Sequence, residues 1–235
     1  MMRRPHLLKL ICAATLMALG LFAQPAWSIT ITAADITDGT SHASVPGADI
    51  DANGGTFVTS SFNGWDGFFG VQNGAVPTEI DILNDEYIRI TFDTPQVIEL
   101  IELGRLFEEG SFDDQVDERA EIIAGRDGAS NLLGLLTVID ASNASWTGSV
   151  STPTNLSLGN ESGAGVWRIL DPFGDNAVTS LTFDPWGWPG LVREDGGQNS
   201  DFALLTITTI PEPHTAALFG LGLAGLAILG RRQRA

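Results

Sequence analysis

The chain has 235 residues and a formal net charge of −17 at pH 7, with 29 acidic residues against 12 Lys and Arg. An acidic surface of this kind repels nucleic acid and anionic lipid surfaces, so we expect no nucleic-acid partner and a preference for divalent cations. A single cysteine excludes a disulfide framework.

The N-terminal segment, residues 1–28, has the composition of a secretory signal peptide. A positively charged start at residues 3–9 is followed by an apolar stretch at residues 10–23 and by small residues where a signal peptidase cuts. We therefore expect export and cleavage before Ile29. The only cysteine, Cys12, would leave with this segment, and the mature chain would then have no thiol chemistry.

The body of the chain, residues 29–210, is long enough for one domain with a hydrophobic core. Its β-branched and aromatic residues form short runs between turn signals, and no helical period persists, which is typical of an antiparallel β-sandwich. The expected strands are residues 29–33, 56–62, 87–92, 97–103, 120–124, 132–139, 146–150, 165–170, 178–183 and 202–208.

Residues 87–103 give the clearest local prediction. Residues 87–92 alternate between apolar and polar side chains, residues 93–96 have turn character, and residues 97–103 are largely apolar. This pattern predicts an antiparallel hairpin. One or two helical turns within residues 112–124 are an alternative to a strand there, because acidic residues favour a helix start.

Residues 86–103 resemble the middle of a jelly-roll sandwich of the galactose-binding or discoidin type, in which a strand ending in an aromatic residue precedes a turn and an apolar strand. The resemblance implies a mostly β fold in which residues 202–207 form the last strand and close the sheet. It carries no diagnostic motif for a ligand.

A candidate metal site lies near the mature N-terminus. Asp49, Asp51 and Asn53 place oxygen atoms at alternate positions and are followed by Gly54, which is the first half of an EF-hand-like calcium loop. The twelfth position of such a loop is Ser60, so the closing carboxylate would come from elsewhere. The pattern predicts bound Ca²⁺, and the alternative is an ordinary polar turn.

Tryptophans flanked by glycine suggest a site for sugars. Trp65, Trp186 and Trp188 each lie beside glycine in turn-rich sequence, and a flat ring can cover the apolar face of a pyranose. The alternative is that these rings pack in the core, where glycine allows close approach.

The evidence for catalysis is weak. His42 is the only histidine of the body, and no nucleophile elbow or Ser-His-Asp sequence pattern is present. Glu99 and Glu102 interrupt an apolar run, and paired carboxylates can hydrolyse glycosides. However, an inward carboxylate paired with Arg89 or Arg105 explains the pattern without chemistry. We therefore expect no catalytic residues and no enzyme.

The last 25 residues, 211–235, begin with a stiff stretch made of Pro211, Glu212 and Pro213, where the prolines fix φ and favour extended backbone. Residues 214–230 are apolar and would be about 25 Å long as a helix, the short end of what a bilayer core of about 30 Å requires. We expect one C-terminal transmembrane helix there.

A basic cluster ends the chain and consists of Arg231, Arg232 and Arg234, which the positive-inside rule places on the cytoplasmic side. The order of Pro-Glu-Pro, apolar run and arginines resembles the PEP-CTERM sorting signal of Gram-negative bacteria, although Ile210 stands where Val is usual. The resemblance implies membrane anchoring, processing by an exosortase, and a final place in the envelope or outside the cell. The alternative is a plain membrane anchor.

Together these patterns predict an exported envelope or extracellular-matrix protein whose body has a structural or interaction role. A carbohydrate-binding module that recognises exopolysaccharide is the second hypothesis, and a glycan-active enzyme is the third. Exposure of the three tryptophans would separate the first two, and a facing carboxylate pair in a cleft would favour the third.

Overall fold

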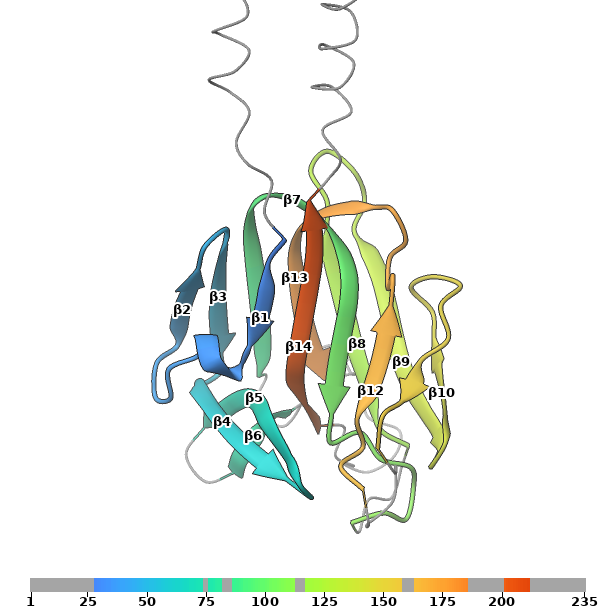
Figure 1. Cartoon of the computed structure of the whole chain (residues 1–235). Helices are drawn as coiled ribbons and strands as arrows, with labels where there is room; N and C mark the ends of the chain where they lie inside the picture. Colours follow the sequence, from blue (N-terminus) through green and yellow to red (C-terminus); the bar gives the residue numbers. More distant parts are fainter. Residues whose placement is uncertain are drawn as a thin grey trace, which may run out of the picture. The chain divides into compact units, whose positions relative to one another are not determined.

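The computed structural model describes residues 28–73, 76–81, 86–112, 117–157, 163–185 and 201–211. Contacts divide the chain into two units, and all described residues lie in one of them, Ser28–Pro211 (Figure 1). The predicted signal peptide up to residue 27 and the predicted transmembrane helix at about residues 214–230 lie outside the described residues. Within the described ranges, no helix is long and apolar enough to cross a membrane.

The body is mostly β and its strand pairings are antiparallel, which confirms the predicted class. A short 3-10 helix, η1 (Ala33–Asp35), follows the first strand. The strands of the described residues are β1 (Thr30–Thr32), β2 (His42–Val45), β3 (Ala48–Asn53), β4 (Thr56–Phe62), β5 (Trp65–Asn73), β6 (Val76–Asp81), β7 (Tyr87–Gly104), β8 (Arg119–Gly125), β9 (Leu132–Asp140), β10 (Asn143–Trp146), β11 (Thr154–Asn155), β12 (Trp167–Leu170), β13 (Ala177–Pro185) and β14 (Asp201–Pro211). They share one hydrogen-bonded sheet with the main order β10-β9-β8-β13-β7-β14-β6-β5-β4.

The long strand β7 joins the parts of this sheet. Along one edge, β7 pairs with β3 at residues 87–92 and with β14 at residues 96–104. Along the other edge, it pairs with β13 at residues 88–91 and 96–97 and with β12 at residues 100–103. The predicted hairpin at residues 87–103 is therefore wrong. Residues 93–96 stay extended because strands distant in sequence supply their partners, and the N–H of Asp93 donates to the carbonyl of Gly47 at 3.0 Å.

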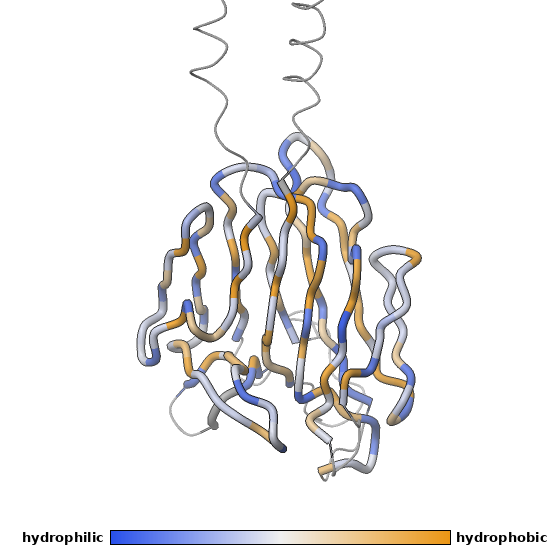
Figure 2. Tube along the Cα trace, in the orientation of Figure 1, coloured by the Kyte–Doolittle hydropathy of each residue, from blue (hydrophilic) through white to orange (hydrophobic). Residues whose placement is uncertain are grey.

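The sheet is curled, and β13 and β8 lie behind β14 and β12 in Figure 1. The main core fills the inside of the curl, with side chains from β1, β3, β7, β8, β13 and β14. Buried residues alternate with exposed ones along β3 and with half-buried ones along β8. Figure 2 shows hydrophobic and hydrophilic residues alternating along several strands. The largest fully buried side chains are Trp167, Phe57, Phe68, Phe69, Phe173, Phe183 and Phe202.

Two further local predictions can be compared with the structure. Residues 119–125 form β8. The helical alternative for residues 112–124 is therefore wrong for residues 119–124. The last strand expected at residues 202–208 is confirmed as β14, which continues to Pro211. It lies inside the sheet, with β7 on one side and β6, β5 and β1 successively on the other.

Candidate functional site

The end of β14 stays in the sheet as far as Pro211. Its last three residues pair with residues 96–98 of β7. Thr209 is fully buried, whereas the neighbouring Ile210 is 41% exposed. The described part of the chain therefore ends in a paired strand.

Hydrogen bonds hold Thr209 from both sides. We call the residues that make them the Thr209 latch: Ser28, Ile29, Gln96 and Thr209. The N–H of Ile29 donates to Thr209 Oγ1 at 3.1 Å, and the Thr209 hydroxyl donates to Gln96 Oε1 at 3.1 Å. The N–H of Thr209 donates to the Ile29 carbonyl at 2.9 Å, and the Ser28 hydroxyl donates to the Thr209 carbonyl. Gln96 Nε2 donates in turn to Thr94 Oγ1 at 3.0 Å, so the buried polar atoms are connected.

A comparison with protein families identifies the segment that begins at the end of β14. Residues 209–234 match the family model of the PEP-CTERM protein-sorting motif. The chain carries a PEP-CTERM sorting signal. The motif indicates export and sorting to the cell envelope, and it implies processing by an exosortase. Searches of curated proteins and of solved structures returned no match.

The predicted sorting residues lie inside the matched PEP-CTERM range. They are Pro211, Glu212, Pro213, Arg231, Arg232 and Arg234. Of these, Pro211 belongs to β14, and the others lie outside the described residues. The match begins two residues earlier than the predicted motif, at Thr209, so its first part belongs to the folded body.

The predicted calcium ligands Asp49, Asp51 and Asn53 lie on a strand, so the expected EF-hand-like loop is wrong in its geometry. They occupy alternate exposed positions of β3, and the other three residues of the strand, Ala48, Ile50 and Ala52, are buried. Side chains at such positions point to one face about 7 Å apart along the strand, farther apart than in a chelating loop. Among the described residues, no group of three or more His, Cys, Asp and Glu is arranged to hold a metal ion.

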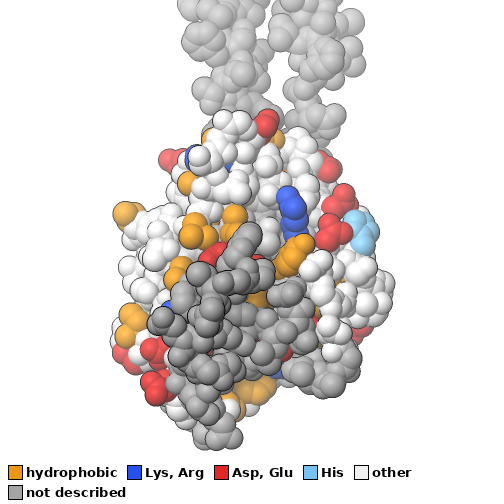
Figure 3. All heavy atoms as spheres, turned by 180° about the vertical axis from the view of Figure 1, so that it is seen from behind, with side chains coloured by type: hydrophobic (Ala, Val, Ile, Leu, Met, Phe, Trp, Pro, Cys, Tyr) orange, Lys and Arg blue, Asp and Glu red, His pale blue; other side chains and the backbone are white. Residues whose placement is uncertain are grey.

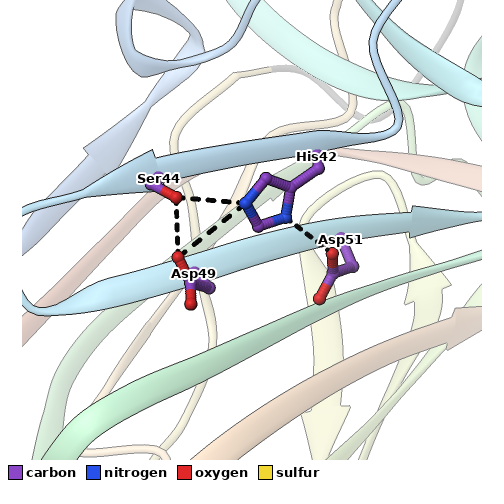
Figure 4. Close-up of polar contacts among 4 residues, drawn as sticks. All are labelled: His42, Ser44, Asp49 and Asp51. Carbon is purple, nitrogen blue, oxygen red and sulfur yellow. Dashed lines mark hydrogen bonds and ion pairs between the residues drawn. The ribbon is translucent and has the colours of Figure 1, made fainter.

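A histidine on β2 occupies the space between two of these carboxylates. Acidic side chains gather beside histidine on the rear face in Figure 3, and Figure 4 shows the contacts. His42 Nδ1 lies 2.8 Å from Asp51 Oδ1, and its Nε2 lies 3.1 Å from Ser44 Oγ. The hydrogen bond to Asp51 raises the pKa of His42, and the charges of Asp51 and Asp49 act in the same direction.

The order Asp51, His42, Ser44 has the connectivity of a catalytic triad, which the sequence did not predict. However, the Ser44 hydroxyl donates to Asp49 Oδ1 at 2.6 Å. With its proton used there, Ser44 can only accept from His42 Nε2. Both ring nitrogens then donate, so the network suits an imidazolium, whereas a general base needs a free nitrogen lone pair. The side chains of His42 and Asp51 are also 56% and 53% exposed, which leaves water in contact with them.

Calcium at this site remains a prediction. We expect millimolar Ca²⁺ to raise the melting temperature more than NaCl of equal ionic strength, because a cation bound only to the folded state stabilises it by about 2.7 kcal/mol at a hundredfold excess over its dissociation constant. Asp51→Ala should abolish the difference, and Asp127→Ala, in an exposed turn, should leave it intact. Identical melting curves in the two salts would contradict the prediction.

Trp65 is half-buried and packs on a second, smaller apolar cluster that includes Phe68 and Leu205. Trp186 and Trp188 lie outside the described residues. Close to Trp65 in the sequence, the ring centroid of Phe62 lies 5.4 Å from that of Phe112, whose side chain is 40% exposed. This end of the sheet therefore combines partly exposed aromatic rings from β4, β5 and the segment after β7.

An arginine lies beneath these rings. The Arg105 guanidinium is 4.9 Å from the Phe62 ring centroid and donates to Glu79. Three of the four non-glycine residues with positive φ in the described chain lie here: Asn63 (46°), Arg105 (61°) and Phe112 (50°). Such backbone is costly for bulky side chains, less so for Asn, and strained residues of this kind cluster at active and ligand-binding sites.

Glu99 and Glu102, the two carboxylates that interrupt the apolar run of β7, lie on opposite faces of the strand, as expected for residues three positions apart. Glu99 is exposed, and Glu102 is buried on the other face. Glu102 accepts from Arg168 Nε at 2.8 Å, so its partner is Arg168 and not Arg89 or Arg105. This pair lies on β7 and β12 and fills a structural role.

Proposed function

We propose that the chain is an exported protein of the bacterial cell envelope or extracellular matrix, and that its folded body has a structural or interaction role without enzymatic activity. The observation that supports export and the envelope location is the PEP-CTERM motif, which begins within β14. In this proposal residues 1–28 direct export, and residues 214–230 hold the chain in the membrane before processing.

The proposed architecture of the body is a jelly-roll-like sandwich formed by one curled sheet. Its support is β7, whose partners change along its length from β3 to β14 on one edge and from β13 to β12 on the other. A strand that passes from one group of partners to another turns a corner between layers.

The sorting function is tested by changing the glutamate of the motif. In a host with an exosortase, we expect Glu212→Ala to leave the exported chain uncleaved at its C-terminus. Glu212 supplies the only charge of the Pro-Glu-Pro stretch, so its loss should remove the charged group by which the enzyme recognises the motif. Intact-mass measurement of the exported chain gives the result, with Glu194→Ala as a control outside the motif. A mutant of normal mature mass would leave a plain membrane anchor as the better explanation.

A carbohydrate-binding module that recognises exopolysaccharide is the second candidate. It is favoured by the partly exposed rings of Trp65 and Phe112 and by the strained backbone beside them. A glycan-array screen of residues 29–211 should show binding to uncharged polysaccharides, since the acidic body repels anionic ones. Phe112→Ala should remove that binding, and an array without any signal would dismiss the candidate.

A glycan-active enzyme, the third hypothesis, has less support. The buried carboxyl groups of Glu79 and Asp201 are hydrogen-bonded to each other. Glycoside hydrolysis needs two carboxyl groups about 5–9.5 Å apart with the sugar between them. Direct contact between these two leaves no room for a glycosidic bond.

A further inference from the structure

The sorting motif begins inside the folded body. The family match starts at Thr209, and residues 209–211 are paired with residues 98–96 of β7. At Thr209 the other edge of the strand is also occupied, because its N–H donates to the Ile29 carbonyl and its hydroxyl accepts from the Ile29 N–H. The first part of the motif is thus held on both sides.

This arrangement conflicts with the way enzymes usually bind peptide segments. An extended peptide is recognised largely through its backbone N–H and C=O groups, which add to a strand edge of the receptor. While β14 is docked, Thr209 offers no free edge, and its side chain has no exposed surface. An enzyme that reads the whole matched segment can do so only after the end of β14 separates from its neighbours.

We propose that the Thr209 latch is a gate on processing of the sorting tail. The exosortase-type enzyme acts when Thr209 has separated from Ile29 and Gln96, so the strength of these contacts sets the processing rate. The inference rests on the proposed sorting function. Thr209 acts in it as a positioning residue that holds the end of β14 in the sheet.

The gate also connects the two ends of the body. Ser28 and Ile29 flank the predicted signal-peptidase site, and both bind Thr209. Cleavage before Ile29 removes the Ser28 contact and turns the Ile29 amide N–H into an α-ammonium group, which can still donate to Thr209 Oγ1. Removal of the signal peptide therefore changes the hydrogen bonds of the latch itself.

The test measures the rate of C-terminal processing of the full-length chain in an exosortase host, by pulse-chase with intact-mass readout. Thr209→Val keeps the β-branched shape but leaves the Ile29 N–H without its acceptor and Gln96 Oε1 without its donor. We expect processing at least threefold faster than in the parent chain. The matched control is Thr208→Val, at the neighbouring half-buried threonine, and its rate should equal that of the parent.

A second variant keeps the test independent of any loss of stability. Thr30 and Thr208 lie directly opposite each other on β1 and β14, so Thr30→Cys/Thr208→Cys can form a disulfide that locks the docked strands. Processing should slow at least threefold and recover when a reductant is added.

The outcomes separate the gate from the sorting function. Equal rates for Thr209→Val and Thr208→Val, or normal processing of the oxidised double-cysteine chain, would overturn the gate. If Thr209→Val fails to accumulate, the double-cysteine chain decides alone. Normal processing of Glu212→Ala would instead remove the sorting function on which the gate rests.

Discussion

Replacing Trp167 by alanine is expected to lower the free energy of unfolding by about 3–5 kcal/mol, a large part of the 5–15 kcal/mol typical of a domain. The side chain is fully buried in the main core, and β12 places it opposite Leu103 of β7. Its Nε1 also donates to the carbonyl of Leu106 at 3.1 Å, which fixes the start of the segment after β7. The substitution therefore opens a cavity and leaves a buried carbonyl without its donor.

Urea denaturation of residues 29–211 measures this loss. Trp65→Ala is the matched control. Trp65 is half-buried on the smaller apolar cluster, so its replacement should lower the free energy of unfolding clearly less. Trp167→Phe should recover part of the loss by refilling the cavity, although it cannot restore the hydrogen bond to Leu106. Equal losses at the two tryptophans would show that Trp167 is not a core residue.

The body is expected to lose stability as the pH rises from about 5 to about 8, by an amount on the order of a few kcal/mol. Burial, followed by the charge and hydrogen bond of Asp201, raises the pKa of Glu79 from 4.5 to about 8, against the opposing effect of Arg105. Burial likewise raises the pKa of Glu86 to about 7. Between pH 4.5 and about 8 the folded state binds more protons than the unfolded state. The stabilisation from the protonated carboxyl groups is therefore complete below pH 4.5, and it is lost as the pH rises through the raised pKa values of Glu86 and Glu79 in the folded state.

Thermal melting at a series of pH values checks the expectation. Glu79→Gln keeps the side-chain shape without a titrating proton, so its pH profile should be flatter and its stability at pH 8 higher than that of the parent chain. Glu99→Gln, at an exposed position of β7, should leave the profile unchanged. A Glu79→Gln chain with the parental slope would show that the carboxyl pair is not the origin of the effect.

The sequence predicts some strands well because their signals are local. The run predicted at residues 56–62 is β4 (Thr56–Phe62), and β8 and β13 extend their predicted runs by one or two residues at each end. β3 was missed although it alternates strictly between buried and exposed positions. There the short residues Ala48 and Ala52 alternate with acidic ones, so the segment has the composition of a polar turn.

Strand partners could not be predicted from the sequence. Residues 93–96 have turn composition, yet they continue β7, because Asp93 hydrogen-bonds to Gly47 and Gln96 has partners in both β13 and β14. The sorting signal could be predicted because it consists only of the order of three sequence features: Pro-Glu-Pro, an apolar run and a cluster of arginines. The Thr209 latch was not, because the bonds of Thr209 to Ile29 and Gln96 join residues 180 and 113 positions apart.

The place of β14 in the sheet has a mechanical consequence. A pull on the C-terminal tail acts along this strand, which runs antiparallel to β7 over eight paired positions from Ala203 to Pro211. Force in that direction shears all these pairs together, whereas force across an edge strand would open them one at a time. The body is therefore suited to resist tension that is applied along β14.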